Sequence, residues 1–194
     1  WLVEAEVLGR SGVQDALARL SIDGQCRVTT PFHQAANRLR ERLRGAGAHG
    51  TCGVGVGETV RHSLEYPEQV MRYADLLPCS TADAQAQLDR TQAIRETLLA
   101  ELLPQCELSD VDCLDEELQI IQNEPLAGRW LNHCRALARQ CPPVSAEEIH
   151  RQLTQPGCVL FEGAQGVLLD EWRGFHPHTT WSTISTAAVN GVAA

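Results

Sequence analysis

The sequence predicts an α/β fold with a large helical insertion between two core strands. Two short segments have the composition of β-strands. Residues 26–30 are rich in β-branched residues, and residues 158–161 form a continuous apolar run. The residues between them show mostly helical periodicity, so the insertion is expected to be helical.

Helices are predicted along most of the remaining chain. In the basic stretch, Leu39 and Leu43 have helical spacing, and the arginines beside them are expected to form a solvated surface rather than an anion site. Ser80 or Thr81 should cap the longest helix, whose buried stripe is Leu88, Ile94, Leu98 and Leu102, and Pro104 should end it. Ser145 and Glu148 match a capping box. We expect helices at 1–19, which Gly12 interrupts and can split in two, and at 34–44, 68–77, 80–103, 125–141 and 145–155. Loops are expected at 45–57, 106–116 and 179–194.

The composition indicates one globular domain. The 194 residues are 43% hydrophobic and 21% charged, which is ordinary for a folded domain with a sizeable core. The formal net charge of −9 disfavours non-specific binding to nucleic acid, which needs a basic surface. No apolar run approaches the ~20 residues of a membrane span, and no secretory signal is visible. We therefore expect a cytoplasmic protein without nucleic-acid or membrane partners.

The eight cysteines are expected to be free thiols, because no pair has the spacing typical of zinc or redox sites. His176 and His178 have a spacing that suits a metal on an extended strand, but no third ligand accompanies them. No metal site is predicted in the chain.

Two glycine-containing turns are the candidate binding elements. Residues 45–57 hold six glycines, and this stretch is either an anion-binding loop or a flexible linker, since it lacks the Walker A pattern. The second turn, Glu162 to Gly166, follows the predicted strand at 158–161. Its glycines tolerate positive φ, and Gln165 could read a polar ring edge. The ends of strands are common ligand sites in α/β sheets, although a plain bend has the same pattern.

Three segments together have the motif order of one enzyme family. Residues 161–170 have the pattern FEGAQGxLLD, and residues 50–58 are similar to GTTGRGIGP. His33, Ala35, Arg40 and Glu41 fit a helix start of the form HxAxxxxRE. In this order the segments resemble the adenylosuccinate synthetase family over about residues 1–190. The resemblance implies that residues 1–194 are the central segment of one domain with a partial P-loop-NTPase-like fold.

The resemblance also implies a GTP-dependent ligase of purine biosynthesis. In such an enzyme GTP phosphorylates the 6-oxygen of IMP and aspartate displaces the phosphate, with Mg²⁺ as cofactor, and the protein is expected to be a homodimer. The implied nucleotide-binding residues are Gln165, Thr180, Thr51, Cys52, Gly163 and Gly166.

Several departures from the family pattern lie on the phosphate side of this site. Cys52 replaces a threonine that contacts phosphate, and Val54 replaces an arginine. A second family arginine has no clear match, although Arg61 and Arg72 flank its place. The chain is therefore either a divergent paralogue with a different substrate, which we favour, or a synthetase with substitute ligands.

The family's catalytic segments are not among these residues. The loop of the form GDEGKGK, the segment with the general-acid histidine and the carboxy-terminal part that binds guanine and aspartate are missing. We expect no catalytic residue in this segment and no activity from it alone. The alternatives are a non-catalytic nucleotide-binding or interaction module and a helical scaffold with glycine linkers.

Overall fold

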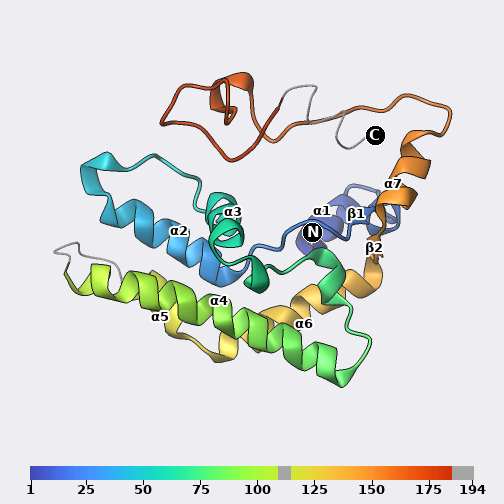
Figure 1. Ribbon diagram of the computed structural model, residues 1–194. Helices are drawn as coiled ribbons and strands as arrows, with labels where there is room; N and C mark the ends of the chain where they lie inside the picture. The colour runs from blue at the N-terminus through green and yellow to red at the C-terminus, as the bar shows by residue number, and fades with distance from the viewer. Residues whose placement is uncertain (109–114, 185–194) are drawn as a thin grey trace.

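The computed structural model describes residues 1–108 and 115–184, which form a helical body and an irregular layer (Figure 1). The layer consists of residues 158–184, drawn in orange and red. The chain reaches it through α7 (Ala146–Leu153) at one end of the body. From this connection the layer lies along one side of the body (Figure 1).

Four helices share the hydrophobic core of the body: α2 (Pro31–Leu43), α4 (Thr81–Glu107), α5 (Asp115–Gln122) and α6 (Pro125–Gln140). Proline begins both α2 and α6, at the position where a helix needs no N–H donor. The largest fully buried apolar side chains are Phe32, Leu39, Leu76, Ile94, Leu98, Leu102, Ile121 and Leu131. The predicted stripe of α4 is therefore confirmed, with Leu88 at its partly buried edge.

The sheet of the described residues is one short parallel pair. β1 (Ile22–Asp23) pairs with β2 (Pro143–Val144), and Gly24 N donates to Val144 O at 2.9 Å. The pair holds the chain before α2 against the end of α6. The α/β class is thus found as a mostly helical body with a small parallel sheet.

Both predicted core strands are wrong in their positions. In residues 26–30, Arg27 forms an isolated bridge with Arg72, and Thr30 is the N-cap of α2. Residues 158–161 form no strand, and Leu160 is 90% exposed. A segment with high β-propensity forms a strand only where it can pair with another strand. Among the described residues, no strand lies next to residues 158–161.

Several helix boundaries also differ from the predictions. The amino-terminal helix is shorter, with α1 at Leu2–Arg10 and a 3₁₀ turn at Leu17–Arg19. The glycine-rich loop predicted at residues 45–57, the glycine loop, runs into an unpredicted helix, α3 (Val56–Glu65). The helix expected at 68–77 is instead two 3₁₀ turns, Pro67–Gln69 and Tyr73–Leu76.

The predicted N-cap residues are confirmed, but one predicted stop is wrong. Ser80 Oγ accepts from Asp83 N at 3.1 Å, and Ser145 Oγ accepts from Glu148 N at 3.3 Å. The Glu148 carboxylate accepts from Arg151, so the second half of the predicted capping box is not formed. Pro104 lies inside α4, which continues to Glu107. Of the predicted loops, residues 109–114 and 185–194 lie outside the described residues.

The cysteines in the described part of the chain are free thiols, as predicted, and Cys113 lies outside it. None of the described helices is long and apolar enough to cross a membrane.

Candidate functional site

Asp170 organises the irregular layer of residues 158–184. Its side chain is buried. Oδ1 accepts hydrogen bonds from the backbone N–H groups of Trp172 (2.8 Å) and Arg173 (2.9 Å), and Oδ2 accepts from Ile184 N (2.8 Å). These donors, Ile184 N–H first, hold the pKa of Asp170 below its ordinary value. The carboxylate thus joins the turn after residue 170 to the backbone of Ile184.

Gly174 allows this layer to fold tightly. A Cβ at this position would lie 2.5 Å from Leu168 O and 2.6 Å from Asp170 O. Gly174 N donates to Asp170 O at 2.9 Å, and Phe175 N donates to Leu168 O at 3.0 Å. No side chain larger than hydrogen fits between these carbonyls without moving the backbone.

Gln165 and Thr180 both lie in this layer. Gln165 is half-buried, and its Nε2 reaches Ser182 O at 3.5 Å, the outer limit of a hydrogen bond. Thr180 N and Thr180 Oγ1 both donate to Leu169 O, at 2.9 Å and 3.2 Å. Because the backbone N–H already satisfies this carbonyl, the hydroxyl can turn to another acceptor at little cost.

The two predicted glycines beside Gln165 do not have the expected backbone. Neither Gly163 nor Gly166 is among the glycines with positive φ, and Gly166 has φ −85°. A Cβ at Gly163 would make ordinary contacts, and one at Gly166 would meet nothing within 4 Å. The turn therefore does not use the positive φ that its glycines would tolerate.

The glycine loop has the positive φ angles instead. Gly50, Gly53 and Gly55 have φ of 73°, 71° and 82°. The loop is held on α2, because Gly50 N donates to Glu41 Oε1 at 2.6 Å and Gly53 O accepts from Arg38 at 3.1 Å. It is therefore an ordered loop rather than a free linker.

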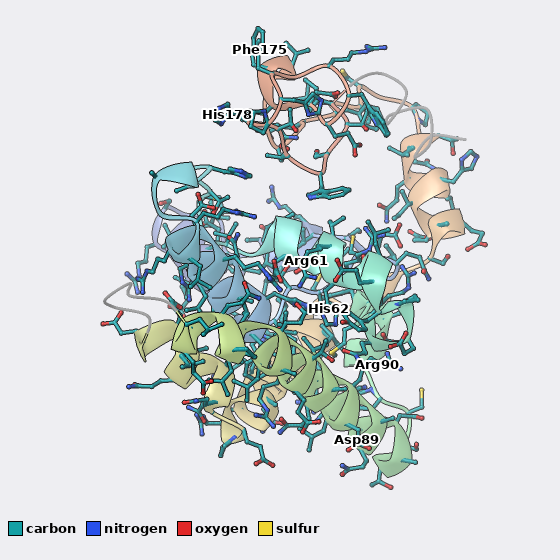
Figure 2. All side chains as sticks on the ribbon, turned by 60° about the vertical axis from the view of Figure 1, so that its left-hand side comes forward. Arg61, His62, Asp89, Arg90, Phe175 and His178 are labelled. Atoms are coloured by element: carbon teal, nitrogen blue, oxygen red, sulfur yellow. The ribbon has the colours of Figure 1, made fainter. Side chains whose placement is uncertain are left out.

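Thr51 and Cys52 are exposed on this loop. Thr51 Oγ1 lies 3.4 Å from Asn37 Oδ1, a long hydrogen bond. The layer approaches the end of the loop through Trp181, since a Cβ at Gly57 would lie 3.6 Å from Trp181 Cδ1. Figure 2 shows the layer, which carries Phe175 and His178, above α3, which carries Arg61 and His62. The layer thus meets the end of the glycine loop at Trp181, the residue after Thr180.

A buried ionic cluster underlies α3, and sequence reasoning missed it. Glu58 Oε1 accepts from Arg40 Nε (3.1 Å) and Arg61 Nη2 (2.6 Å), and Glu101 Oε2 accepts from both arginines. Arg38 pairs similarly with the buried Glu117. The prediction of a solvated arginine surface is therefore wrong for Arg38 and Arg40. Their acidic partners lie 18 to 79 positions away in sequence, and no local pattern reveals them.

Among the described residues, no group of three or more His, Cys, Asp or Glu side chains gathers in a way that could hold a metal ion. His176 Nδ1 lies 3.3 Å from Thr179 Oγ1.

Comparison with known proteins identifies the family. The profile of adenylosuccinate synthetase matches residues 1–193. The chain belongs to the adenylosuccinate synthetase family. Members of this family are ligases of purine biosynthesis.

Adenylosuccinate synthetases from several bacteria are similar to this chain. The protein of Anaeromyxobacter sp. strain Fw109-5 is 31% identical over 90% of the chain and 36% of its own length. That of Anaeromyxobacter dehalogenans strain 2CP-1 is 31% identical over 98% of the chain and 40% of its own length. That of Acidovorax ebreus strain TPSY is 30% identical over 97% of the chain and 42% of its own length. The chain therefore spans about two fifths of the adenylosuccinate synthetases it matches.

The two arginines that flank the place of a family arginine are both engaged. Arg61 belongs to the ionic cluster with Glu58 and Glu101. Arg72 Nη1 donates to Gln25 O at 3.0 Å. Neither guanidinium is therefore free of protein partners.

Proposed function

We propose that this chain forms part of the IMP-binding site of a GTP-dependent ligase that joins aspartate to IMP. The observation that supports the proposal is the family match over residues 1–193, combined with an ordered glycine loop whose end is contacted by Trp181 of the layer that carries Gln165 and Thr180. On this proposal, the segment is the central part of one domain and does not catalyse the reaction alone.

The roles of the residues follow from their free hydrogen-bonding capacity. The Gln165 amide is held by one contact at 3.5 Å, so it can turn to the edge of the purine ring. The Thr180 hydroxyl can leave Leu169 O and bind the nucleotide. Thr51 and Cys52 are exposed and are proposed to bind the phosphate, and Gly163 and Gly166 are proposed to contact the nucleotide beside Gln165.

The other substrates belong to other parts of the protein on this proposal. We propose that GTP, aspartate and Mg²⁺ are held mostly by other parts of the protein, as the family resemblance implies. We also propose that the protein is a cytoplasmic homodimer, because the resemblance to the family implies this assembly.

A second candidate is a paralogue that binds a different nucleotide. It rests on Cys52 and Val54, because a thiol is a weak donor and a valine offers none, whereas phosphate is best bound by charged or strong donors. IMP titration of the parent protein separates the two candidates. Tight IMP binding supports the synthetase, and tighter binding of another purine nucleotide supports the paralogue.

Calorimetric titration of the full-length protein with IMP tests the role of Gln165. Losing one such contact typically costs about 1.5 kcal/mol, so we expect Gln165→Ala to weaken binding about tenfold. Gln155→Ala is the matched control, because this exposed glutamine of the α7 end contacts only its own helix through Arg151 O. Equal affinities of the parent and Gln165→Ala would remove Gln165 from the site.

A further inference from the structure

The layer of residues 158–184 meets the first turn of α3 at Trp181. A Cβ at Gly57 would lie 3.6 Å from Trp181 Cδ1, which is ordinary van der Waals contact. The indole therefore lies over Gly57 with room for a methyl group beneath it. Trp181 is still 56% exposed, so α3 covers only part of the ring.

The backbone on both sides of this indole is fixed within the layer. Thr180 N and Thr180 Oγ1 both donate to Leu169 O, at 2.9 Å and 3.2 Å. Ser182 O accepts from Glu171 N at 3.1 Å and lies 3.5 Å from Gln165 Nε2. A movement of this segment relative to α3 therefore also moves Thr180 and Gln165.

The first turn of α3 is fixed in turn on α2. Gly55, the residue before α3, is so close to α2 that a Cβ there would lie 2.9 Å from Gln34 N. Thr59 Oγ1 donates to Gly55 O at 2.9 Å, which ties the start of α3 to the end of the glycine loop. The surface under the indole and the glycine loop, which carries Thr51 and Cys52, are thus parts of one ordered unit.

The spacing between these two units depends on packing. The chain connects the layer to the body through α7 at one end, and the layer lies above α3 (Figures 1 and 2). A connection at one end leaves the distance between the layer and α3 to non-covalent contacts. Trp172 and Phe175 of the layer are 77% and 70% exposed, so these large side chains contribute little to such contacts.

We propose that Trp181 is a positioning residue for the proposed nucleotide site. Its indole seats the layer on the first turn of α3, and this sets the distance from Gln165 and Thr180 to Thr51 and Cys52. The inference rests on the proposed function, because it requires both pairs of residues to bind one nucleotide. A ligand that touches both units binds only while the layer is seated, so its apparent dissociation constant rises as the seated fraction falls.

Gly57 fits this role as the surface on which the indole rests. It is not among the glycines with positive φ, so its backbone does not require glycine. Glycine is also unfavourable inside a helix relative to alanine. A longer side chain at this position would enter the space that the Trp181 indole covers. Gly57 is therefore the position at which the contact can be strengthened or blocked without touching the layer.

Fluorine-19 NMR of the full-length protein labelled with fluorotryptophan tests the contact without a ligand. The resonances of Trp181 and Trp172 are assigned by their loss in Trp181→Phe and Trp172→Phe. Gly57→Ala places a methyl group 3.6 Å from Trp181 Cδ1, so we expect it to shift the Trp181 resonance and not that of Trp172. An unmoved Trp181 resonance would overturn the proposal.

Calorimetric titration of the full-length protein with IMP tests the positioning role. Trp181→Ala removes the indole, so we expect the dissociation constant of IMP to rise about tenfold. Trp181→Phe keeps a flat apolar ring and should bind IMP within about threefold of the parent. The matched control is Trp172→Ala, an exposed tryptophan of the same layer, whose affinity should equal that of the parent. Circular dichroism checks that each variant is folded at the titration temperature.

Gly57→Leu separates positioning from direct contact between the indole and the nucleotide. Its side chain should displace the indole, so we expect about a tenfold loss of IMP affinity in the parent and no further loss in Trp181→Ala. Losses that multiply to about a hundredfold in the double variant would mean that the two positions act independently, which contradicts the proposal. If Trp181→Ala weakens binding and Gly57→Leu does not, the indole contacts the nucleotide itself and the positioning role is wrong.

Failure of this inference can be told apart from failure of the proposed function. If the parent binds IMP and Trp181→Ala binds it equally well, the proposed function stands and the positioning role is wrong. If the parent does not bind IMP, the proposed function fails and the positioning role falls with it, whatever the fluorine-19 spectra show of the contact.

Discussion

At the scale of single residues, buried charge decides which substitutions matter. Glu58 is 5% exposed and accepts from two arginines, whereas Glu65 pairs with one of the same arginines while its side chain is 48% exposed. The two carboxylates thus share a partner and differ in burial. This makes them a matched pair for measuring what burial contributes.

We expect Glu58→Gln to lower the free energy of unfolding by about 3 kcal/mol, because it removes the more deeply buried of the two carboxylates that Arg40 and Arg61 share. Glu65→Gln should cost less than about 1 kcal/mol, since exposed ion pairs are weak. Urea unfolding curves give both values. Equal losses would show that the cluster is no stronger than a surface pair.

The buried His33 predicts a loss of stability in acid. Its pKa is about 3 in the folded chain and near 6.5 when unfolded, so below pH 6.5 the unfolded state binds more protons. Stability should therefore fall as the pH drops from 6.5 toward 3, by up to about 1.4 kcal/mol per pH unit from this group. Urea unfolding of the parent and of His33→Asn at pH 7, 5 and 4 isolates the effect, because carboxylates contribute equally to both. Parallel pH profiles would contradict it.

At the scale of elements, features that act within one helical turn can be predicted from the sequence, whereas pairings between distant segments cannot. The caps at Ser80 and Ser145 and the prolines that begin α2 and α6 act within one helical turn, so they could be recognised. The pairing of β1 with β2 joins residues 22–23 to 143–144, and no local pattern indicates it. The glycine loop was recognised from composition, but α3 directly after it was not, because Gly57 lies in its first turn.

Gly55 is where the glycine loop becomes α3, and it should tolerate no side chain. It has φ +82°, and a Cβ would lie 2.9 Å from Gln34 N. We expect Gly55→Ala to cost about 2 kcal/mol in the free energy of unfolding. Gly47→Ala is the control, because a Cβ there meets nothing within 4 Å, and its effect should stay within about 0.5 kcal/mol. Urea midpoints check both, and similar losses would mean that the close approach to α2 does not restrict this position.

At the scale of the whole molecule, the helical body and the layer of residues 158–184 are held by different forces. The body has a continuous apolar core that includes Phe32, Leu98 and Leu131. The layer is held by hydrogen bonds around Asp170, while its large apolar side chains, such as Trp172 and Phe175, are 77% and 70% exposed (Figures 1 and 2). A region with little buried apolar surface opens at lower free energy than a packed core.

The layer should therefore open independently of the body. In hydrogen exchange of the 194-residue chain, we expect amides around Asp170 to exchange faster than those of α2 and α4. Gly174→Ala, which places a Cβ 2.5 Å from Leu168 O, should remove protection in the layer and leave the protection of α4 unchanged. Gly166→Ala, where a Cβ meets nothing within 4 Å, should change neither. Loss of protection in α4 of the Gly174 variant would show instead that layer and body unfold as one unit, and that the hydrogen bonds of Asp170 stabilise the whole chain.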